Sequence, residues 1–148
     1  MKTLPVAAAL SIMLATGAWA AQSSNDRNAQ ELARFERYAA PPQDSMHYFR
    51  LDNFQYLGKN AKGEESIAVW TGVNQVYLLA LQAPCINLDR PLAIALTSTS
   101  GNVHPRMDFV KYGDSGIPRQ CRIETIRKVD YKAMRAAKEA ASAQSSGT

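Results

Sequence analysis

The strongest constraint on the fold lies where two apolar segments are joined by a very short polar connection. Residues 67–71 and 76–81 contain β-branched and aromatic side chains, and the Thr-Gly-Val-Asn sequence at 71–74 is typical of a tight turn. The pair therefore predicts an antiparallel hairpin around Trp70 and Tyr77. The second segment is apolar on both of its faces, which indicates a central strand covered on two sides.

Further elements are predicted on both sides of this hairpin. Alternating or apolar segments predict strands at 46–56, 92–97, 103–110 and 121–129, with a glycine- and proline-containing loop at 113–118. Asp26 and Asp130 are potential N-caps of two helices, one ending near Tyr38 and the other near Ala141.

The close spacing of the strands sets the fold class. Short connections favour antiparallel pairing, because a parallel pair needs a long crossover, usually a helix, between its strands. We therefore expect an α+β, β-rich fold: a small antiparallel meander sheet or partial barrel of about six strands, flanked by an N-terminal and a C-terminal helix and carrying one disulfide.

The amino terminus has the three parts of a secretory signal peptide. Lys2 provides the positive charge, residues 4–14 form the apolar run, and the small residues Ala18 and Ala20 predict cleavage before Ala21. The alternative is a retained membrane anchor. The apolar run is too short for that role, because a spanning helix needs roughly 20 apolar residues.

Cleavage defines the expected domain organisation and compartment. It divides the chain into a signal peptide (1–20), a single β-rich domain (21–141) and a disordered tail (142–148). The chain has 148 residues, so 128 remain after cleavage, enough for one domain. We expect a soluble periplasmic protein with no transmembrane segment in the mature chain.

The two cysteines, Cys85 and Cys121, are expected to form one structural disulfide in an oxidising compartment. The alternative is a redox-active or nucleophilic thiol. It has little support, because the sequence contains no Cys-x-x-Cys and neither cysteine has a histidine close by in sequence.

No motif predicts a catalytic, cofactor-binding or metal site. His47 and His104 lack a second ligand at helical spacing, and Asp108 would lie some 13 Å from His104 along a strand. A Gly-x-Ser-x-Gly elbow and a glycine-rich phosphate loop are both missing. We therefore name no catalytic residue, cofactor or metal, and the sequence leans against an enzyme.

Positive charge gathers near the C-terminus. Without Lys2 the chain keeps 16 Lys and Arg against 13 Asp and Glu. We define the basic segment as the possible partner-binding residues Arg122, Arg127, Lys128, Lys132 and Arg135. It suits an envelope protein or an anionic envelope surface. A solvated strand edge and helix face is the other interpretation, and nucleic acid is not expected outside the cytoplasm.

Six aromatic residues could form either a ligand cleft or the core and its rim. They are Tyr48, Phe49, Phe54, Tyr56, Trp70 and Tyr77.

Taken together, several short motifs resemble one family. They are Tyr48-Phe49-x-Leu51, Ala68-Val69-Trp70-Thr71, Tyr77-Leu78-Leu79, Pro84-Cys85-x-x-Leu88, Ile94-x-Leu96-Thr97-Ser98, Gly101-x-Val103, Asp108-x-Val110 and Cys121-Arg122-Ile123-x-x-Ile126-Arg127-x-Val129-Asp130. This pattern, from about Glu31 to Arg135, resembles the domain of unknown function 6491 family (DUF6491), small exported proteobacterial proteins. The resemblance implies a Gram-negative source and a paired cysteine, but no activity. Members often look like lipoproteins, whereas this chain has no lipid-acceptor cysteine near its cleavage site.

Two functions follow as hypotheses. The first is a non-catalytic periplasmic binding or interaction module that uses the hairpin and the basic segment. The alternative is a small periplasmic enzyme, hydrolase-like, whose site is assembled from residues distant in sequence. A thiol-redox protein is a third and weaker hypothesis.

Overall fold

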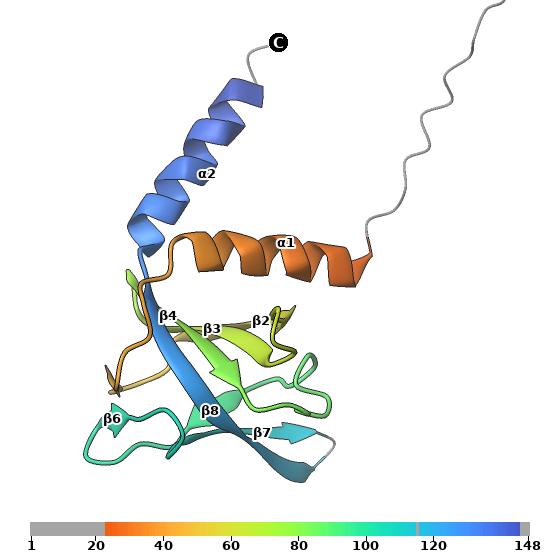
Figure 1. Cartoon of the computed structure of the whole chain (residues 1–148), viewed down its shortest axis with the longest axis vertical. Coiled ribbons are helices and arrows are strands. Elements are labelled where there is room, and N and C mark those ends of the chain that lie inside the picture. The colour runs from red at the N-terminus through yellow and green to blue at the C-terminus, as the bar shows by residue number, and fades with distance from the viewer. Residues whose placement is uncertain (1–22, 115, 146–148) are drawn as a thin grey trace, which may run out of the picture.

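The computed structural model describes residues 23–114 and 116–145 (Figure 1). The predicted signal peptide lies outside the described residues, as does the end of the predicted tail. The elements are α1 (Ser24–Arg37), β1 (Met46–His47), β2 (Asn53–Lys59), β3 (Glu65–Gly72), β4 (Gln75–Leu81), β5 (Ile94–Leu96), β6 (Asn102–Val103), β7 (Phe109–Asp114), β8 (Ile117–Val129) and α2 (Tyr131–Ser145).

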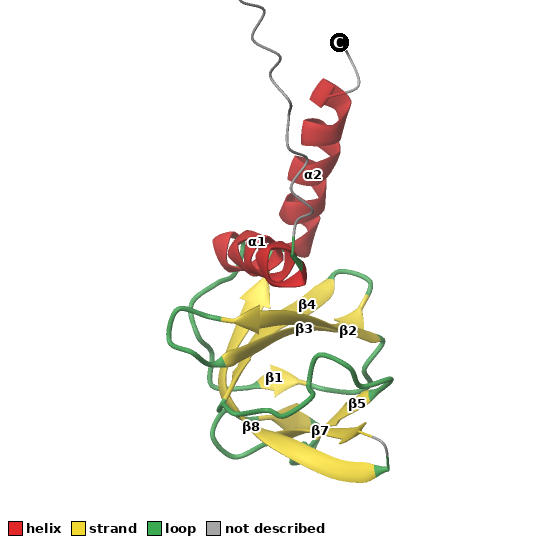
Figure 2. Cartoon of the chain, turned by 90° about the vertical axis from the view of Figure 1, so that its right-hand side faces the viewer, coloured by secondary structure: helices red, strands yellow, loops and turns green. Residues whose placement is uncertain are grey.

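The expected α+β, β-rich class is confirmed. Six strands form one antiparallel sheet in the order β2-β3-β4-β8-β7-β5, and β1 pairs with β6 in a separate ribbon. The sheet consists of two meanders, β2-β3-β4 and β5-β7-β8, joined where β4 pairs with β8. It curls into a half-barrel with a helix at each end of the chain (Figure 2).

The predicted hairpin is β3-β4. Trp70 lies opposite Val76 and Val69 opposite Tyr77, with the turn at exposed Val73 and Asn74. β4 is also the central strand that its two apolar faces predicted, because it lies between β3 and β8 and is buried from Val76 onward.

The two faces of the sheet carry two separate cores. Successive strand residues point to opposite faces, so Ile67, Val69 and Leu79 line the inside of the half-barrel, whereas Ala68 and Leu78 face α1. The pairing of β4 with β8 is irregular at one point, because its register shifts between Ala80, which pairs with Thr125, and Leu81, which pairs with Ile123. The inner core also contains Met46, Leu81, Leu88, Val103, Val110, Ile123 and Ile126, and the outer core contains Leu32, Phe35, Val76, Val129 and Met134.

Both helices differ from the prediction at one end. Ser23, not Asp26, is the N-cap of α1, and its Oγ accepts a hydrogen bond from the Asp26 backbone N–H at 3.2 Å. Asp130 caps α2 as expected, because its carboxylate accepts a hydrogen bond from the Ala133 backbone N–H at 3.0 Å. The helix runs to Ser145, past the predicted end at Ala141, so the first part of the predicted tail, 142–145, is helical. Alanine-rich sequence favours this continuation.

Three strand or loop predictions were also wrong. The predicted strand at 46–56 is interrupted, with only Met46–His47 and Asn53–Lys59 in strands. The predicted strand at 103–110 is interrupted by a turn that follows β6. The predicted loop at 113–118 is instead the tip of the β7-β8 hairpin, where Gly113 pairs with Pro118 and Gly116 adopts φ +83°.

The disulfide joins Cys85 and Cys121, with their Cα atoms 5.9 Å apart. Cys121 lies on β8, and Cys85 lies in the connection between β4 and β5. Both half-cystines are buried in the inner core. The bond therefore ties this long connection to the inside of the half-barrel.

Candidate functional site

The basic segment does not form one surface. Arg122 pairs with Glu124 at 3.1 Å on β8. The Arg127 guanidinium donates to the carbonyl oxygens of Ala40 and Ala39 at 2.8 and 3.0 Å, which fastens the chain leaving α1 against β8. Arg127 therefore supports the fold, whereas the ion pair of Arg122 stays within one strand.

Lys128, Lys132 and Arg135 are exposed, and Arg135 reaches a groove between the two helices. This groove has a volume of about 480 Å³ and is the surface that we call the α1-α2 groove. It is lined by Arg34, Phe35, Gln55, Trp70, Tyr131, Met134, Arg135, Lys138, Glu139 and Ser142.

The floor of the α1-α2 groove is aromatic. Trp70 of β3 lies between Phe35 of α1 and Tyr131 of α2, with ring centroids 6.0 and 5.7 Å away. Both contacts are edge-to-face, at interplanar angles of 89° and 86°. Edge-to-face packing of this kind stabilises aromatic clusters by about 0.5–1.5 kcal/mol per pair beyond burial. The Trp70 ring is thus held in place while remaining half-buried.

The rim of the groove is mainly cationic. Arg34, Arg135 and Lys138 line it, whereas Glu139 is its one acidic residue. Arg135 and Glu139 are 3.6 Å apart, but both side chains are more than half exposed, so their pairing is weak. Arg34 forms an ion pair with Glu31. Its Nε atom is buried without a hydrogen-bond partner among the described residues.

α2 projects away from the rest of the protein (Figure 1). Met134 is its one buried residue, and 135–145 are exposed throughout. Isolated helices shorter than about 12–15 residues are marginal in water. A partner that packs beside this helix would therefore stabilise it as well as fill the groove.

The six aromatic residues largely follow the core-and-rim interpretation. Tyr77 is buried, and Tyr48, Phe54 and Tyr56 pack partly buried against the inner core. Phe49 is 88% exposed, so it belongs to neither core. Trp70 differs from the others because it faces the helices and forms the groove floor.

The predicted separation of His104 and Asp108 was wrong. Because a turn follows β6, the Asp108 carboxylate folds back and accepts a hydrogen bond from the His104 backbone N–H at 2.8 Å. Its other oxygen accepts from the Thr97 hydroxyl at 2.7 Å. The buried Asp108 thus fixes the turn, and the His104 ring lies 3.3 Å from the Asp44 carbonyl oxygen.

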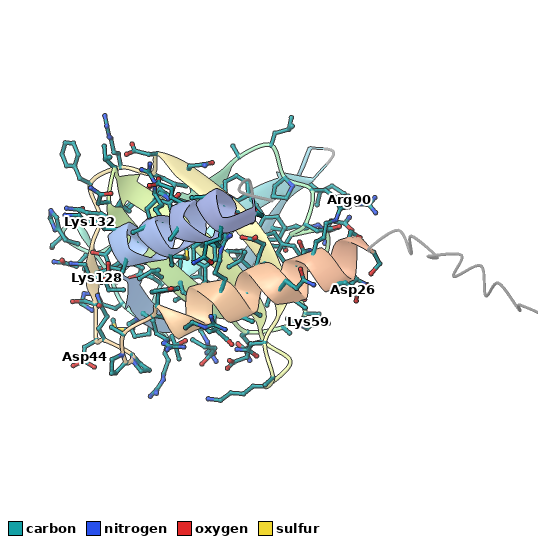
Figure 3. The ribbon with its side chains drawn as sticks, turned by 90° about the horizontal axis from the view of Figure 1, so that it is seen from above. Asp26, Asp44, Lys59, Arg90, Lys128 and Lys132 are labelled. Carbon is teal, nitrogen blue, oxygen red and sulfur yellow. A yellow bond between two sulfur atoms is a disulfide. The ribbon has the colours of Figure 1, made fainter. Side chains whose placement is uncertain are left out.

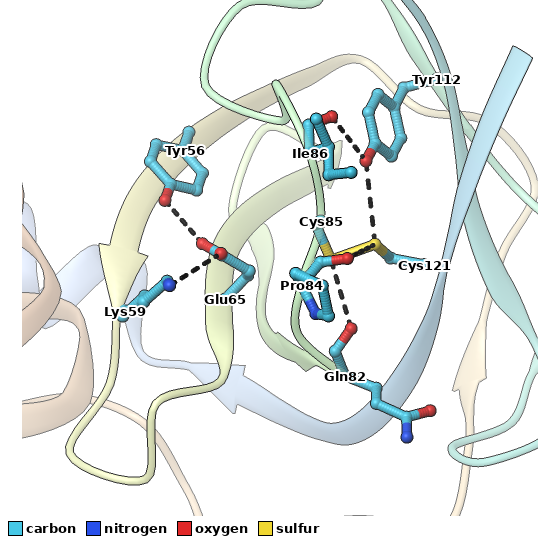
Figure 4. Close-up of a disulfide and its surroundings, with 9 residues drawn as sticks. All are labelled: Tyr56, Lys59, Glu65, Gln82, Pro84, Cys85, Ile86, Tyr112 and Cys121. Carbon is cyan, nitrogen blue, oxygen red and sulfur yellow. Dashed lines mark hydrogen bonds and ion pairs between the residues drawn. A yellow bond between two sulfur atoms is a disulfide. The ribbon is translucent and has the colours of Figure 1, made fainter.

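A polar cluster that no sequence motif revealed lies within the curled sheet (Figure 4). The Tyr56 hydroxyl donates to Glu65 at 2.6 Å, and the Lys59 ammonium lies 3.7 Å from the same carboxylate. Glu65 itself is buried. The signal available in the sequence was a glutamate at the start of an apolar strand, since such a carboxylate needs partners if it becomes buried.

The environment of this cluster changes the acidity of Tyr56. Burial, then the hydrogen bond to Glu65 and the negative charges of Glu65 and Asp89, raise the pKa of the phenol well above its usual 10.0. The folded state therefore holds this proton more tightly than the unfolded state. The resulting stabilisation is complete below pH 10 and is lost as the pH rises from 10 through the folded pKa.

We expect Tyr56 to stay protonated when ordinary tyrosines ionise. In an ultraviolet titration of the native protein at about pH 11, the parent and Tyr56→Phe should show equal phenolate absorbance. In denaturant the parent should show one phenolate more, which is the internal control. An extra phenolate in the native parent near pH 10 would contradict the hydrogen-bonded, buried phenol.

Among residues 23–114 and 116–145, no three His, Cys, Asp or Glu side chains gather as a metal site would require. The same residues contain no helix long and apolar enough to cross a membrane.

The fold and these surfaces define a class of protein: a small half-barrel domain that carries one disulfide and has a cationic and aromatic groove between its terminal helices. Residues 1–145 match the model of a family of unknown function, DUF6491. The chain belongs to the DUF6491 family, as its motifs indicated. No curated protein and no solved structure matches the chain.

Proposed function

We propose that this protein is an exported, periplasmic interaction module without catalytic activity, which binds an acidic segment of an envelope protein in the α1-α2 groove. One observation carries the proposal: the fixed, half-buried Trp70 ring lies at the floor of a groove whose rim carries Arg34, Arg135 and Lys138. Aromatic anchors and arginines are the residues that dominate binding energy in protein interfaces.

The shape of the surface favours a protein segment over a lipid surface. Helices that bind membranes insert large apolar side chains from one protruding face. Here the aromatic rings are recessed in the groove, and 135–145 of α2 contain only Arg, Ala, Lys, Glu, Ser and Gln. An amphipathic segment could place its apolar face on Trp70 and its acidic side chains against the rim.

The test compares two charge-reversed variants of equal net charge. Arg135→Glu/Lys138→Glu changes the rim, whereas Lys62→Glu/Lys111→Glu changes exposed lysines that do not line the groove. In affinity capture from envelope extracts, the rim variant should recover at least about tenfold less of an acidic partner, a loss of about 1.4 kcal/mol. The control variant should recover as much as the parent at the same salt concentration.

Arg127 is unsuitable for this test, because its guanidinium holds the chain between α1 and β1 in place. Equal recovery by both variants would contradict the proposal. So would binding of anionic phosphatidylglycerol vesicles, in place of a protein, that depends on the same rim residues.

A further inference from the structure

A second concave surface lies at the other end of α1, away from the α1-α2 groove. It consists of two adjoining hollows of about 400 and 380 Å³, both lined by Asn25, Asn28 and Tyr56. Asp89 borders the first hollow and Lys59 the second. Figure 3 shows Lys59 and Arg90, the neighbour of Asp89, near the N-terminal end of α1. We call this surface the polar cleft.

The polar cleft contains hydrogen-bonding groups that the fold leaves unused. Asn25 and Asn28 are three residues apart, so their side chains lie on one face of α1. Neither amide has a hydrogen-bond partner in the described part of the chain. Each amide offers two donors and an acceptor. The Asp89 carboxylate, about half exposed, adds further acceptors.

Rigid elements hold these groups in position. A β-bulge shifts the register of β2 between Tyr56 and Gly58, and Gly58 adopts φ +86°. A Cβ atom at Gly58 would lie 3.5 Å from the Asn28 Cβ, so α1 and β2 are in close contact at this point. The hydrogen bond from Tyr56 to buried Glu65 fixes the phenol, and Tyr56 lines both hollows.

The charges around the polar cleft balance. Asp89 pairs with Arg90 at 3.3 Å, and Lys59 pairs with Glu65 at 3.7 Å. The charged residues that line the cleft are Lys59 and Asp89, one of each sign, so the lining has no net charge to attract an anion or a cation. Amide and carboxylate groups near a tyrosine match a ligand with several neutral hydroxyl groups and an apolar carbon face. The volumes are also those of small-molecule sites.

We propose that the polar cleft binds an uncharged saccharide, with Asn25, Asn28 and Asp89 hydrogen-bonding adjacent hydroxyl groups and the Tyr56 ring contacting the sugar face. This site goes beyond the proposed function, since it uses the opposite end of α1 from the α1-α2 groove. Either site can fail without affecting the other.

Residue-resolved NMR titration of the disulfide-intact, ¹⁵N-labelled protein tests this site with two probes, maltotriose and tri-N-acetylchitotriose. At least one should cause saturable shifts of the Asn25 and Asn28 side-chain amides and of the Gly58 backbone, with a dissociation constant of about 1 mM or tighter. Asn28→Ala and Asp89→Ala should each weaken binding at least about tenfold.

Asp44→Ala is the matched control, because Asp44 is an exposed carboxylate near the opposite end of α1 (Figure 3). It should bind the saccharide as the parent does. Asp89 is exposed, so its variant keeps the test valid if Asn28→Ala unfolds. The proposal is overturned if neither saccharide gives saturable shifts at these residues, if all variants bind equally, or if inorganic phosphate binds there more tightly.

Discussion

Replacing both half-cystines by alanine should lower the free energy of unfolding by about 3–4 kcal/mol. The bond joins residues 36 positions apart, so removing it restores considerable freedom to the unfolded chain. It also releases the connection between β4 and β5, which brings Cys85 and Leu88 into the inner core. Small domains have about 5–15 kcal/mol of stability in total, so the loss is a large part of it.

Urea unfolding of Cys85→Ala/Cys121→Ala beside the parent measures this loss. Adding reductant to the parent should cause a similar decrease, whereas the same reductant should leave the double variant unchanged. A double variant within about 1 kcal/mol of the parent would show that the inner core alone holds the connection in place.

Leu79→Ala should cost about 2–5 kcal/mol. Leu79 lies in the central strand, opposite Ile67 of β3 and Ile126 of β8, and its side chain is fully buried inside the half-barrel. Truncation removes apolar contacts from both meanders at the point where they join. The surrounding strands are fixed by their pairing, so the cavity can collapse only in part.

Val73→Ala is the matched control, because it also removes methyl groups but lies in the exposed turn of the same hairpin. Its thermal unfolding midpoint should stay close to that of the parent. If Leu79→Ala were as stable as this control, the two meanders would not share the continuous inner core described above.

Local signals explain which parts of the fold were predictable. The β3-β4 hairpin is specified by its turn residues and by the apolar, β-branched and aromatic segments on both sides, and Asp130 marks the start of α2 through its own side chain. The strand expected at 103–110 failed because Pro105 and the returning Asp108 carboxylate favour a turn that alternation alone does not reveal. Pairing of β4 with β8 is a long-range contact, and nothing local encodes its register.

The candidate site was only partly predictable for the same reason. Alternation along β3 places Trp70 on the face opposite Val69, and helical spacing predicts that Phe35 lies on the buried face of α1. The meeting of these rings with Tyr131 depends on where the two terminal helices lie, which the sequence does not state. Likewise, the basic segment was visible as charge, but the structural role of Arg127 follows from its hydrogen bonds to the carbonyl oxygens of Ala39 and Ala40, far away in sequence.

Trp70 offers the most direct test of the proposed function, because the only other tryptophan, Trp19, lies in the predicted signal peptide. In a chain prepared without residues 1–20, tryptophan fluorescence therefore reports on the groove floor alone. A panel of synthetic acidic amphipathic peptides should include at least one that shifts the Trp70 emission to the blue and saturates. Its glutamine-substituted counterpart, and the Arg135→Glu/Lys138→Glu variant, should show little change. No saturable change with any acidic peptide, or an equal response from the rim variant, would contradict a partner bound over Trp70.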